Sequence, residues 1–410
     1  MTDQTHIIDR LSIQADGVIR TEDGTIYAPL TLPGEEITGE VAAGRIAQPK
    51  IVTPSASRVR PPCPHYRSCG GCSLQHGADE FVANWKASVV ETALNARDIQ
   101  AKVTEVMTSP ANSRRRATLS GRRTKKGAQV GFHGRASGTI TEISGCTLLR
   151  PELLAHLPTA EALTMAGASR KGELSMTLTL SEAGVEIACS GGKEISADLF
   201  TTLSEIAHKN GLARISWNGE MIAAIRPAWQ AMGRAQVAPP PGAFLQATKE
   251  GEAALTEFVL ENLGKAAKVV DLFSGSGTFT LPLASHADVH AVEAEAPMLE
   301  ALDQGWRKAQ GLHRVTHEVR DLFRRPLLPD ELDRFDVIVI DPPRAGAESQ
   351  IAEICSSKAK RIVHVSCSPI TFSRDAKTLL EAGFVMEKLI AVDQFRWSAH
   401  IEIAALFTRC

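Results

Sequence analysis

The sequence lacks any run of eighteen or more apolar residues, so it predicts no helix that crosses a membrane. Its first residues, MTDQTHIIDR, also lack the basic stretch followed by an apolar stretch that marks a secretory signal. We therefore expect a cytoplasmic protein with no membrane partner. At 410 residues, the chain is long enough for two or three domains, each with a core of its own.

The sequence also lacks an excess of positive charge, since its formal net charge is −2. That total would not suggest a nucleic-acid-binding protein, but the distribution of charge is more informative than the sum. The segment from Arg114 to Lys126, RRRATLSGRRTKK, holds seven cations and no acid. This segment is either a solvated basic loop or a ribbon that contacts RNA phosphates.

The first sixty residues consist of short alternating segments separated by turn residues, which is typical of a small antiparallel β-barrel. We predict an OB-like barrel over residues 1–60. Such barrels often bind single-stranded nucleic acid, although a barrel alone does not identify a function. The predicted strands are Ile7–Ile13, Gly17–Arg20, Thr25–Pro29, Glu36–Ala42 and Gly44–Gln48.

A second pattern follows the linker signal PPPG at 239–242. Helices and strands alternate from there to the end, which predicts a doubly wound α/β domain over residues 246–410. Residues 61–245 are expected to form a mixed α+β central domain, with helices at Asp79–Arg97 and Leu199–Asn210. The predicted C-terminal strands are Lys268–Phe273, Val289–Glu293, Arg314–Val319, Phe335–Asp341, Arg361–Ser366 and an antiparallel pair, Phe384–Val392 and Ile401–Phe407.

The first strand of the C-terminal domain turns into a helix through Gly275 and Gly277, where a ligand can approach the backbone closely. The full GxGxxG fingerprint of a pyrophosphate site is absent, because Thr-Phe-Thr follows the second glycine. Glu293 ends the next strand, where a carboxylate can hold ribose hydroxyls, and Asp321 closes the third. A cofactor with a ribose and no phosphates fits this pattern, which favours S-adenosylmethionine.

Two motifs follow the fourth and fifth strands of the same sheet. DPPR at 341–344 makes a rigid turn of the kind that places a planar target beside the methyl donor in methyltransferases. Cys367 lies in SCSP at 366–369, at the edge where open α/β sheets bind ligands. A thiolate that adds to C6 of uracil makes C5 nucleophilic toward a methyl group. Such a thiol must ionise near neutral pH, and Arg344 and Arg374 are candidate neighbours; a buried structural cysteine is the alternative.

The same chemistry needs a base that removes the proton from C5. Glu402 lies within the apolar segment IEIAA at 401–405, where a charged side chain is costly unless it has a role or a partner. We predict that Glu402 is this base. A glutamate that faces solvent on an edge strand is the alternative.

Four of the eight cysteines form a separate group. Without a signal peptide, the cysteines are not expected to form disulfides. Cys63, Cys69 and Cys72 lie in a short glycine-rich stretch and Cys146 lies in SGC at 144–146. Four thiolates suit zinc or a [4Fe–4S] cluster. Because only one CxxC is present, whereas structural zinc commonly uses paired CxxC knuckles, the pattern favours the iron–sulfur cluster.

With these motifs in place, the chain resembles the bacterial RNA uracil-5-methyltransferases, and within them the iron–sulfur 23S ribosomal RNA enzymes, over nearly its whole length. RRRATLS, GAFLQ, DLFSGSGTFTLPLA, DPPRAGA, VSCSPITFSRD and HIE stand in the family's order. The resemblance implies an N-terminal TRAM domain, a Rossmann-like class I methyltransferase domain, S-adenosylmethionine and a [4Fe–4S] cluster. It also implies that Cys367 is the nucleophile and Glu402 the base. The implied cofactor residues are Gln246, Phe273, Thr278, Glu293, Asp321 and Asp341, and the implied cluster ligands are Cys63, Cys69, Cys72 and Cys146.

Three departures from the family pattern leave the reacting groups in place. Ser368 follows the cysteine where the family usually has Asn, and Thr278 stands where the first glycine-rich turn usually carries Asn. Residues 396–399, RWSA, replace the usual Pro-x-Thr. The last departure bears on how the target base is held.

We therefore predict an enzyme that methylates C5 of a specific uridine in 23S ribosomal RNA, with RNA as its partner and no obligate protein partner. The T-loop of transfer RNA is the nearest alternative substrate. A redox-responsive RNA-binding regulator and a zinc-bearing dehydrogenase are alternatives of other classes. Intact Cys367 and Glu402 argue against the regulator, and an ultraviolet–visible spectrum distinguishes a brown cluster from colourless zinc.

Overall fold

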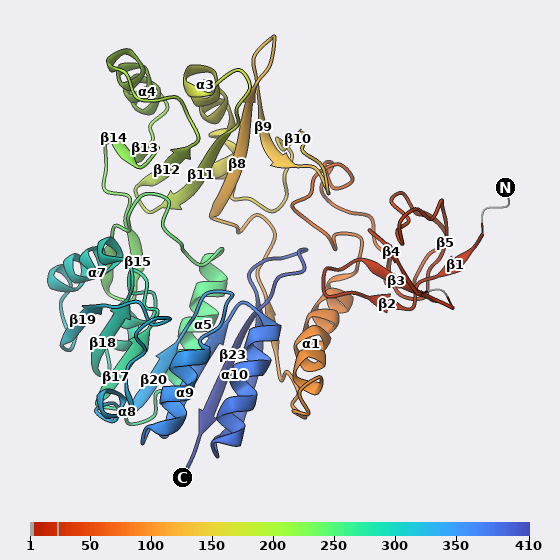
Figure 1. The fold of residues 1–410 in the computed structure, drawn as a ribbon. Helices are drawn as coiled ribbons and strands as arrows, with labels where there is room; N and C mark the ends of the chain where they lie inside the picture. The colour runs from red at the N-terminus through yellow and green to blue at the C-terminus, as the bar shows by residue number, and fades with distance from the viewer. Residues whose placement is uncertain (1–3, 23) are drawn as a thin grey trace.

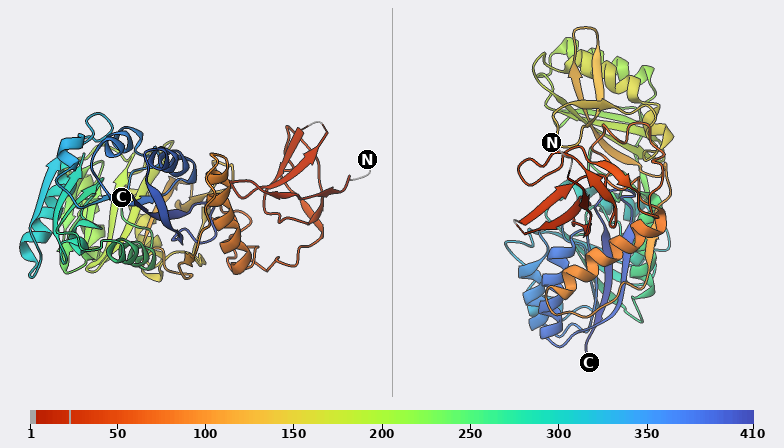
Figure 2. Two further views of the ribbon diagram at one scale, coloured as in Figure 1. Left: turned by 90° about the horizontal axis from the view of Figure 1, so that it is seen from below. Right: turned by 90° about the vertical axis from the view of Figure 1, so that its right-hand side faces the viewer.

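The computed structural model describes residues 4–22 and 24–410 and is elongated, with the N-terminal strands at one end (Figure 1; Figure 2). A central sheet forms the upper part in Figure 1 and a C-terminal sheet forms the lower part. Residues 1–3 and 23 of the predicted barrel lie outside the described residues. Of the helices in the described ranges, none is long and apolar enough to cross a membrane.

The N-terminal part contains two three-stranded sheets, β1-β5-β6 and β2-β3-β4, around a small apolar core that includes Ile19 and Ile37. The predicted strand Ile7–Ile13 is broken in two, and Gly44–Gln48 is not a strand. The second error arises because residues 42–45 form a tight turn, with backbone hydrogen bonds in both directions between Ala42 and Arg45. The strands are β1 His6–Ile7, β2 Arg10–Leu11, β3 Gly17–Thr21, β4 Gly24–Ala28, β5 Glu36–Thr38 and β6 Lys50–Thr53.

The central part is a seven-stranded sheet in the order β10-β9-β8-β11-β12-β13-β14. Helices α3 and α4 pack on each other and on this sheet. The predicted helix Leu199–Asn210 is α4, which begins earlier because the Ser196 hydroxyl accepts a hydrogen bond from the Leu199 amide and caps it. The elements are β8 Arg116–Arg123, β9 Ala128–His133, β10 Ile140–Glu142, α2 Pro151–Leu154, α3 Leu157–Gly167, β11 Leu174–Ser181, β12 Gly184–Ser190, α4 Ala197–Lys209, β13 Arg214–Trp217 and β14 Glu220–Ala224.

The C-terminal part is an eight-stranded sheet in the order β19-β18-β17-β20-β21-β23-β22-β7, and it confirms the predicted α/β class. Strands β17 to β21 are parallel, while β23 runs antiparallel between β21 and β22. Apolar cores lie on both faces, one with α5, α6 and α7 and the other with α9 and α10. The strands are β17 Lys268–Leu272, β18 Asp288–Glu293, β19 Val315–Val319, β20 Val337–Ile340, β21 Arg361–Ser366, β22 Val385–Asp393 and β23 Glu402–Thr408. The helices are α5 Lys249–Glu261, α6 Thr280–Leu283, α7 Ala296–Lys308, α8 Pro329–Leu332, α9 Glu348–Ser356 and α10 Pro369–Glu381.

Two elements from the first half of the chain belong to this C-terminal sheet. Strand β7 (Val106–Thr108) pairs in parallel with β22, and helix α1 (Asp79–Asn95) packs on α10 and β22. Val90 and Leu94 of α1 are buried in the same apolar core as β20 and β21. The predicted division at residue 245 therefore does not separate the two sheets, because β7 and α1 cross it to cover the β22 edge. A short hairpin, β15 (Gln230–Met232) and β16 (Ala235–Val237), packs on α7.

Candidate active site

The predicted reacting groups gather at one edge of the C-terminal sheet. Cys367 follows β21 and Asp341 follows β20, at the carboxyl ends of parallel strands. Glu402 begins β23, which runs in the opposite direction and so starts at the same edge. Because Ser366 pairs with Ile403, the register sets Cys367 and Glu402 at the same level of the sheet. The antiparallel last strand is thus what brings a residue near the end of the chain to the thiol.

Cys367 is partly buried, and its surroundings disfavour the thiolate. Burial raises its pKa to about 11, and the nearby carboxyls of Glu402 and Asp341 add to the rise, while Arg344 lowers it. These surroundings do not favour the predicted ionisation of the Cys367 thiol near neutral pH. Arg374 is not an effective neighbour, because it donates to Asp375 and pairs with Glu348.

Glu402 is 3% exposed, so it does not face solvent. Its pKa is raised to about 8, chiefly by burial and also by the charge of Asp341, while a hydrogen bond from Gln394 and the charge of Arg344 act in the opposite direction. Asp341 itself has a pKa raised to about 7 by burial. Both shifts favour the protonated carboxyls of Glu402 and Asp341 over their ionised forms.

Gln394 joins the predicted base to a predicted cofactor residue, and the sequence reasoning missed it. Its side-chain nitrogen donates to Oε1 of Glu402 at 3.1 Å and to Oε1 of Gln246 at 2.5 Å, while its oxygen accepts from the Ala247 amide at 2.6 Å. All three side chains are buried. The only sequence signal was a polar residue placed directly after the strand that pairs with the one carrying Glu402.

The glycine-rich turn after β17 meets the carboxylate of Glu293. Glu293 accepts hydrogen bonds from the amides of Gly275 at 3.0 Å and Ala294 at 2.6 Å, so its side chain is fixed beside the turn. Gly275 has a φ of +55°, and a side chain there would meet only Met298 at 3.7 Å. The hydroxyl of Ser274 is buried and has no hydrogen-bond partner among the described residues. This side of the turn is thus open and offers an unused polar group.

Phe273 and Asp321 form the neighbouring part of the same edge. Phe273 has a φ of +62°, which is unusual for a side chain of this size. Its ring lies 5.4 Å from that of Phe323, an exposed residue that the sequence reasoning missed. Asp321 accepts from the Phe323 amide at 3.0 Å and holds this turn. Two aromatic rings next to a carboxylate suit a flat, polar-edged group such as adenine.

Thr278 lines a different hollow from these residues. It faces a groove of about 580 Å³ between α5, α6 and the β15–β16 hairpin, which also contains Arg115, Glu252 and His286. Beneath the turn, Asp271 is fully buried, accepts from Thr280 at 2.6 Å and has a pKa raised to about 7, chiefly by burial. Thr278 therefore has the weakest geometric link to the predicted cofactor site.

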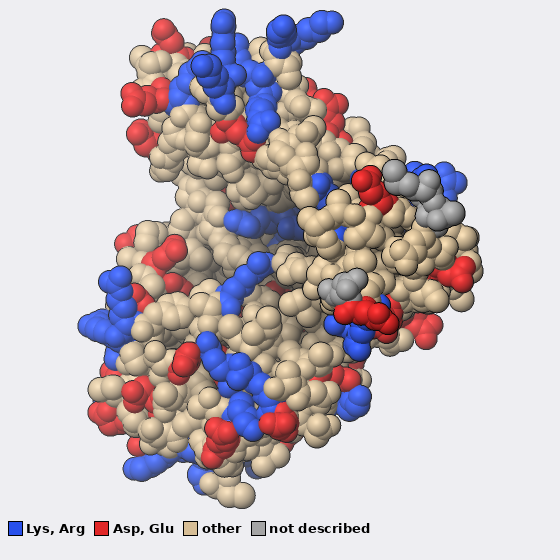
Figure 3. Space-filling model, turned by 45° about the vertical axis from the view of Figure 1, so that its right-hand side comes forward, with Lys and Arg blue, Asp and Glu red and all other residues tan. Residues whose placement is uncertain are grey.

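The basic segment 114–126 is divided between two environments. Arg115 is buried, pairs with Glu252 at 2.5 Å and donates to the carbonyl of Gln246 at 3.1 Å. Arg116 donates to the carbonyls of Gly242 and Ala243, so these two arginines hold the linker before α5. The remaining cations at 122–126 lie at the end of β8 and the turn to β9. Figure 3 shows Lys and Arg side chains at the tip of the upper part and inside the hollow between the upper and lower parts.

The four grouped cysteines line one small cavity, together with apolar and aromatic side chains such as Tyr66 and Leu148. Burial raises the pKa of Cys69 and Cys146 and raises that of Cys72 to about 12. In the part of the chain that the structure describes, no group of three or more His, Cys, Asp or Glu side chains is arranged to hold a metal ion. The iron–sulfur cluster therefore stays a prediction.

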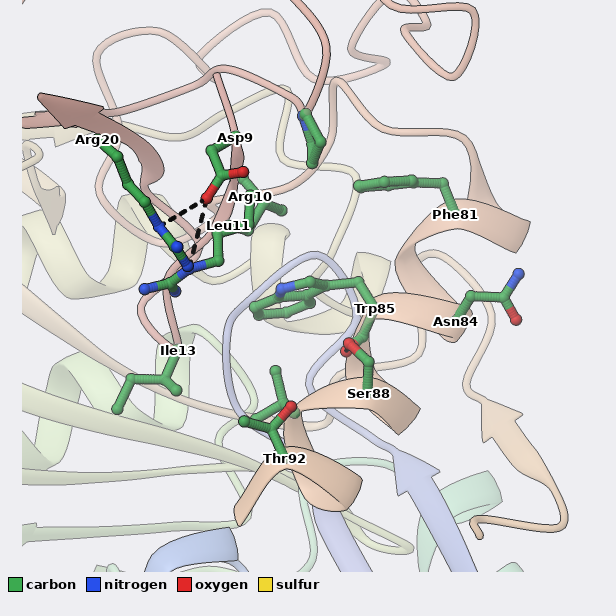
Figure 4. Close-up of a pocket in the computed structure, with 12 residues that line it drawn as sticks. Asp9, Arg10, Leu11, Ile13, Arg20, Phe81, Asn84, Trp85, Ser88 and Thr92 are labelled. Carbon is green, nitrogen blue, oxygen red and sulfur yellow. Dashed lines mark hydrogen bonds and ion pairs between the residues drawn. The ribbon is translucent and has the colours of Figure 1, made fainter. Parts of the chain in front are cut away.

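A further groove of about 620 Å³ lies between the N-terminal strands and α1 (Figure 4). Phe81 and Trp85 of α1 line one wall, and Arg10 and Leu11 line the other. Arg20 lies at its rim, where it pairs with Asp9 at 3.1 Å. This groove is separate from the edge that carries Cys367.

The chain is similar to known RNA methyltransferases in sequence and in fold. Residues 239–410 match the family model described as tRNA (Uracil-5-)-methyltransferase. An uncharacterized RNA methyltransferase of Brucella suis is 41% identical over 96% of this chain and 95% of its own. The 23S rRNA (uracil(1939)-C(5))-methyltransferase RlmD of Aeromonas salmonicida is 30% identical over 98% of this chain and 95% of its own. The solved tRNA (uracil-54, C5)-methyltransferase of Pyrococcus abyssi, in complex with S-adenosyl-L-homocysteine, has the same fold, with a TM-score of 0.76 and 21% identity over 98% of this chain and 99% of its own.

Proposed function

Because this chain belongs to the RNA uracil-5-methyltransferase family, we propose that it methylates C5 of a uridine in 23S ribosomal RNA, with S-adenosylmethionine as donor. The observation that carries the proposal is the meeting of Cys367 and Glu402 at the edge where the parallel strands end. A thiol and a buried carboxyl at one site are the two groups that methylation of a pyrimidine carbon requires.

In the proposed reaction, the Cys367 sulfur forms a bond to C6 of the uracil, and the displaced electron pair makes C5 nucleophilic. Bound S-adenosylmethionine supplies the methyl group as an electrophile. The Glu402 carboxylate then takes the proton from C5. The electrons of that C–H bond restore the C5–C6 double bond and release the Cys367 thiolate. The target base must leave its stack to reach the thiol.

The cofactor would lie against the turn after β17. Glu293 would hold the ribose hydroxyls, and the unpaired Ser274 hydroxyl and open side of Gly275 fit a ligand there. Phe273 and Asp321 would hold the adenine. The proposed pocket residues are Gln246, Phe273, Thr278, Glu293, Asp321 and Asp341, with Thr278 farthest from this arrangement.

The charge of the site supports a cationic ligand. Asp271, Asp341 and Glu402 each have a raised pKa, and Asp341 raises the pKa values of the other two and of Cys367. A positive charge among them would favour their ionised forms and that of Cys367. A sulfonium donor would therefore prepare both the thiolate and the base.

Ribosomal RNA is the favoured substrate because the named relative that acts on 23S rRNA is 30% identical over nearly the whole chain. The cations at 122–126, of which Arg122, Lys125 and Lys126 are exposed, and the basic hollow in Figure 3 suit the backbone of a structured RNA. The fold shared with an enzyme that acts on transfer RNA keeps the T-loop as second candidate.

We also infer that Cys63, Cys69, Cys72 and Cys146 hold a [4Fe–4S] cluster. Four thiols line one cavity, and four thiolates are the donor set that such a cluster takes. Because methyl transfer involves no redox change, the cluster would shape this region rather than pass electrons.

Trapping the covalent adduct tests the mechanism. RNA that contains 5-fluorouridine carries fluorine where the proton must leave, so the enzyme should remain attached to it. We expect a denaturation-resistant complex with the native enzyme and none with Cys367→Ala. Methylation at the native rate by Cys367→Ala would show that the mechanism is wrong.

The substrate is tested by mapping 5-methyluridine in total RNA from a strain that lacks the gene. We expect the modification to disappear from 23S rRNA and to return with the native gene but not with the Cys367→Ala gene. Loss from transfer RNA instead would assign the second candidate.

A further inference from the structure

The loop between β22 and β23, residues 394–401, carries Gln394 at one end and leads into Glu402 at the other; we call it the base loop. Its first residue contacts Glu402 and Gln246 directly. The orientation of the proposed base therefore depends on how this loop is held.

One side chain from α1 binds both ends of the base loop. Lys86 and Asp393, the last residue of β22, form a hydrogen-bonded ion pair in which both side chains are 0% exposed. The Lys86 ammonium also donates to the carbonyls of Phe395 at 3.3 Å and His400 at 2.9 Å. An ammonium has three donors, and all three are used within the eight residues 393–400.

The three Lys86 contacts lie on both sides of Gln394 and just before Glu402. Gln394 lies between two residues that Lys86 binds, Asp393 and Phe395, and His400 lies two residues before Glu402. Fixing these points fixes both the amide that donates to Glu402 and the backbone that enters β23. Because burying two charges is costly, such pairs are weak sources of stability, and a role in setting one conformation is the better account of this one.

We propose that Lys86, paired with Asp393, is a positioning residue for the base Glu402. This inference rests on the proposed function, because it assumes that Glu402 removes the C5 proton. Lys86 touches neither substrate nor cofactor in this account and acts only through the base loop.

If Lys86 positions Glu402, loss of Lys86 should block one step of the reaction, the removal of the C5 proton. When the base is displaced, Cys367 can still attack and the methyl group can still transfer, but the C5 proton stays in place. The methylated adduct then cannot release Cys367, so enzyme and ordinary uridine RNA should remain joined. A loss of stability alone would not produce this species.

The test uses the full-length double variant Lys86→Met/Asp393→Asn, which removes both charges and leaves neither unpaired. The substrate is total RNA from the strain that lacks the gene. We expect kcat to fall about a hundredfold with KM for RNA little changed, since small displacements of catalytic groups have effects of that order. A denaturation-resistant adduct with ordinary RNA should accumulate. Native kcat without adduct would overturn the inference.

The matched control is Arg58→Met/Glu35→Gln, a partly buried ion pair in the N-terminal part that bonds to Leu30, Leu32 and Ser55 and not to the base loop. It should form no adduct with ordinary RNA. If this double variant does not fold, Lys86→Gln/Asp393→Asn, which keeps polar groups at both positions and leaves no charge unpaired, is measured in its place for the same adduct. If the native enzyme forms no adduct with 5-fluorouridine RNA, the proposed function fails; if it does and the variant turns over normally, only the role of Lys86 fails.

Discussion

At the scale of single residues, the site is unusual because it raises the pKa values of its acidic side chains. Cys367, Glu402 and Asp341 all have pKa values above their ordinary range, and in each case the loss of hydration on partial or full burial is the largest cause. Arg344 is the one guanidinium that lowers the pKa values of both Cys367 and Glu402. A cation bound beside these groups would favour their ionised forms.

The first prediction concerns stability and pH. The pKa of Glu402 is about 8 when folded and near 4.5 when exposed, so its contribution to stability is fully present below about pH 4.5 and is lost as the pH rises through 8. Each unit of pKa difference corresponds to about 1.4 kcal/mol. Glu402→Gln should therefore melt at a higher temperature than the native protein at pH 9, and at a similar one at pH 4.5. Equal melting temperatures at pH 9 would contradict the raised pKa.

The second prediction concerns proton release. At neutral pH, binding of S-adenosylmethionine, which carries a positive sulfur, should lower the pKa values of Glu402 and Asp341 and release protons. S-adenosylhomocysteine, which lacks that charge, should release fewer. Calorimetry in buffers of different ionisation enthalpy measures the difference, and equal release for the two ligands would argue against the arrangement. Glu402→Gln should reduce the release with S-adenosylmethionine.

The sequence predicted the positions of residues that belong to a motif at the end of a strand. It did not predict properties that depend on burial, such as pKa values and side-chain hydrogen bonds. The strand-end placement of Cys367, Asp341 and Glu293 followed from the pattern of strands. The pKa of Cys367 and the hydrogen bonds of Gln394 could not be predicted, because both depend on side chains from distant parts of the chain.

At the scale of elements, the loop after β20 and the base loop contact each other through Arg344 and His400. A nitrogen of Arg344 lies 3.3 Å from Nε2 of His400, and the His400 ring packs edge-on to Phe395 at 5.8 Å. Arg114 lies over Phe395 at 5.9 Å. Two cations and two aromatic rings thus lie together where these loops meet, and burial and Arg344 both lower the pKa of His400 and favour its neutral form.

The third prediction concerns this border. Arg344→Met should raise the pKa values of Cys367 and Glu402 further, because the cation that lowers them is removed. The pH–rate profile of kcat should shift to higher pH, and Arg344→Lys should restore part of the shift. A uniform loss of rate at every pH would show that Arg344 serves only to bind RNA. Lys377→Met, on the outer side of α10, is the control and should leave the profile unchanged.

Element-level prediction was most accurate for the buried parallel strands, whose apolar runs are bounded by glycine and acids. It was least accurate in the N-terminal part, where Ile7–Ile13 has the alternation of one strand but pairs in two sheets. Short strands of two residues leave too little pattern for the sequence to show a break.

At the scale of the whole molecule, the first half of the chain holds the base loop at three places. Besides Lys86, Arg396 donates to the carbonyl of Ser109 at 3.0 Å and pairs with Asp79 at 2.7 Å. The Trp397 carbonyl accepts from the amides of Ser73 and Leu74, next to the grouped cysteines. The Trp397 ring packs with Cys63 and Cys72, so the RWSA departure lies between the cysteine cavity and the base.

The fourth prediction follows from β7 and α1. A fragment of residues 239–410 lacks both, so it leaves the β22 edge unpaired and part of the α10 face uncovered. We expect this fragment to aggregate alone and to become soluble when it is co-expressed with residues 1–238. Circular dichroism and gel filtration check this, and cooperative unfolding of the fragment alone would contradict it.

The PPPG linker and the alternation after it predicted a C-terminal α/β sheet, but the sequence did not show that α1 and β7 belong to that sheet. One face of helix α1, which includes Trp85, packs on the N-terminal strands. Another face, which includes Leu94, packs on the C-terminal sheet. A sequence shows that both faces are apolar without showing which partner each one meets.

Because α1 and β7 pack on strands from the end of the chain, they also set an order of folding events during synthesis. Residues 79–108 leave the ribosome long before their partner β22, at 385–393, has been made. At roughly 5–20 residues per second, the delay is on the order of tens of seconds. For that time the apolar flank of α1 lacks its native cover, and the C-terminal sheet cannot be completed until the end of the message has been translated. Chaperone demand should therefore be concentrated in that interval.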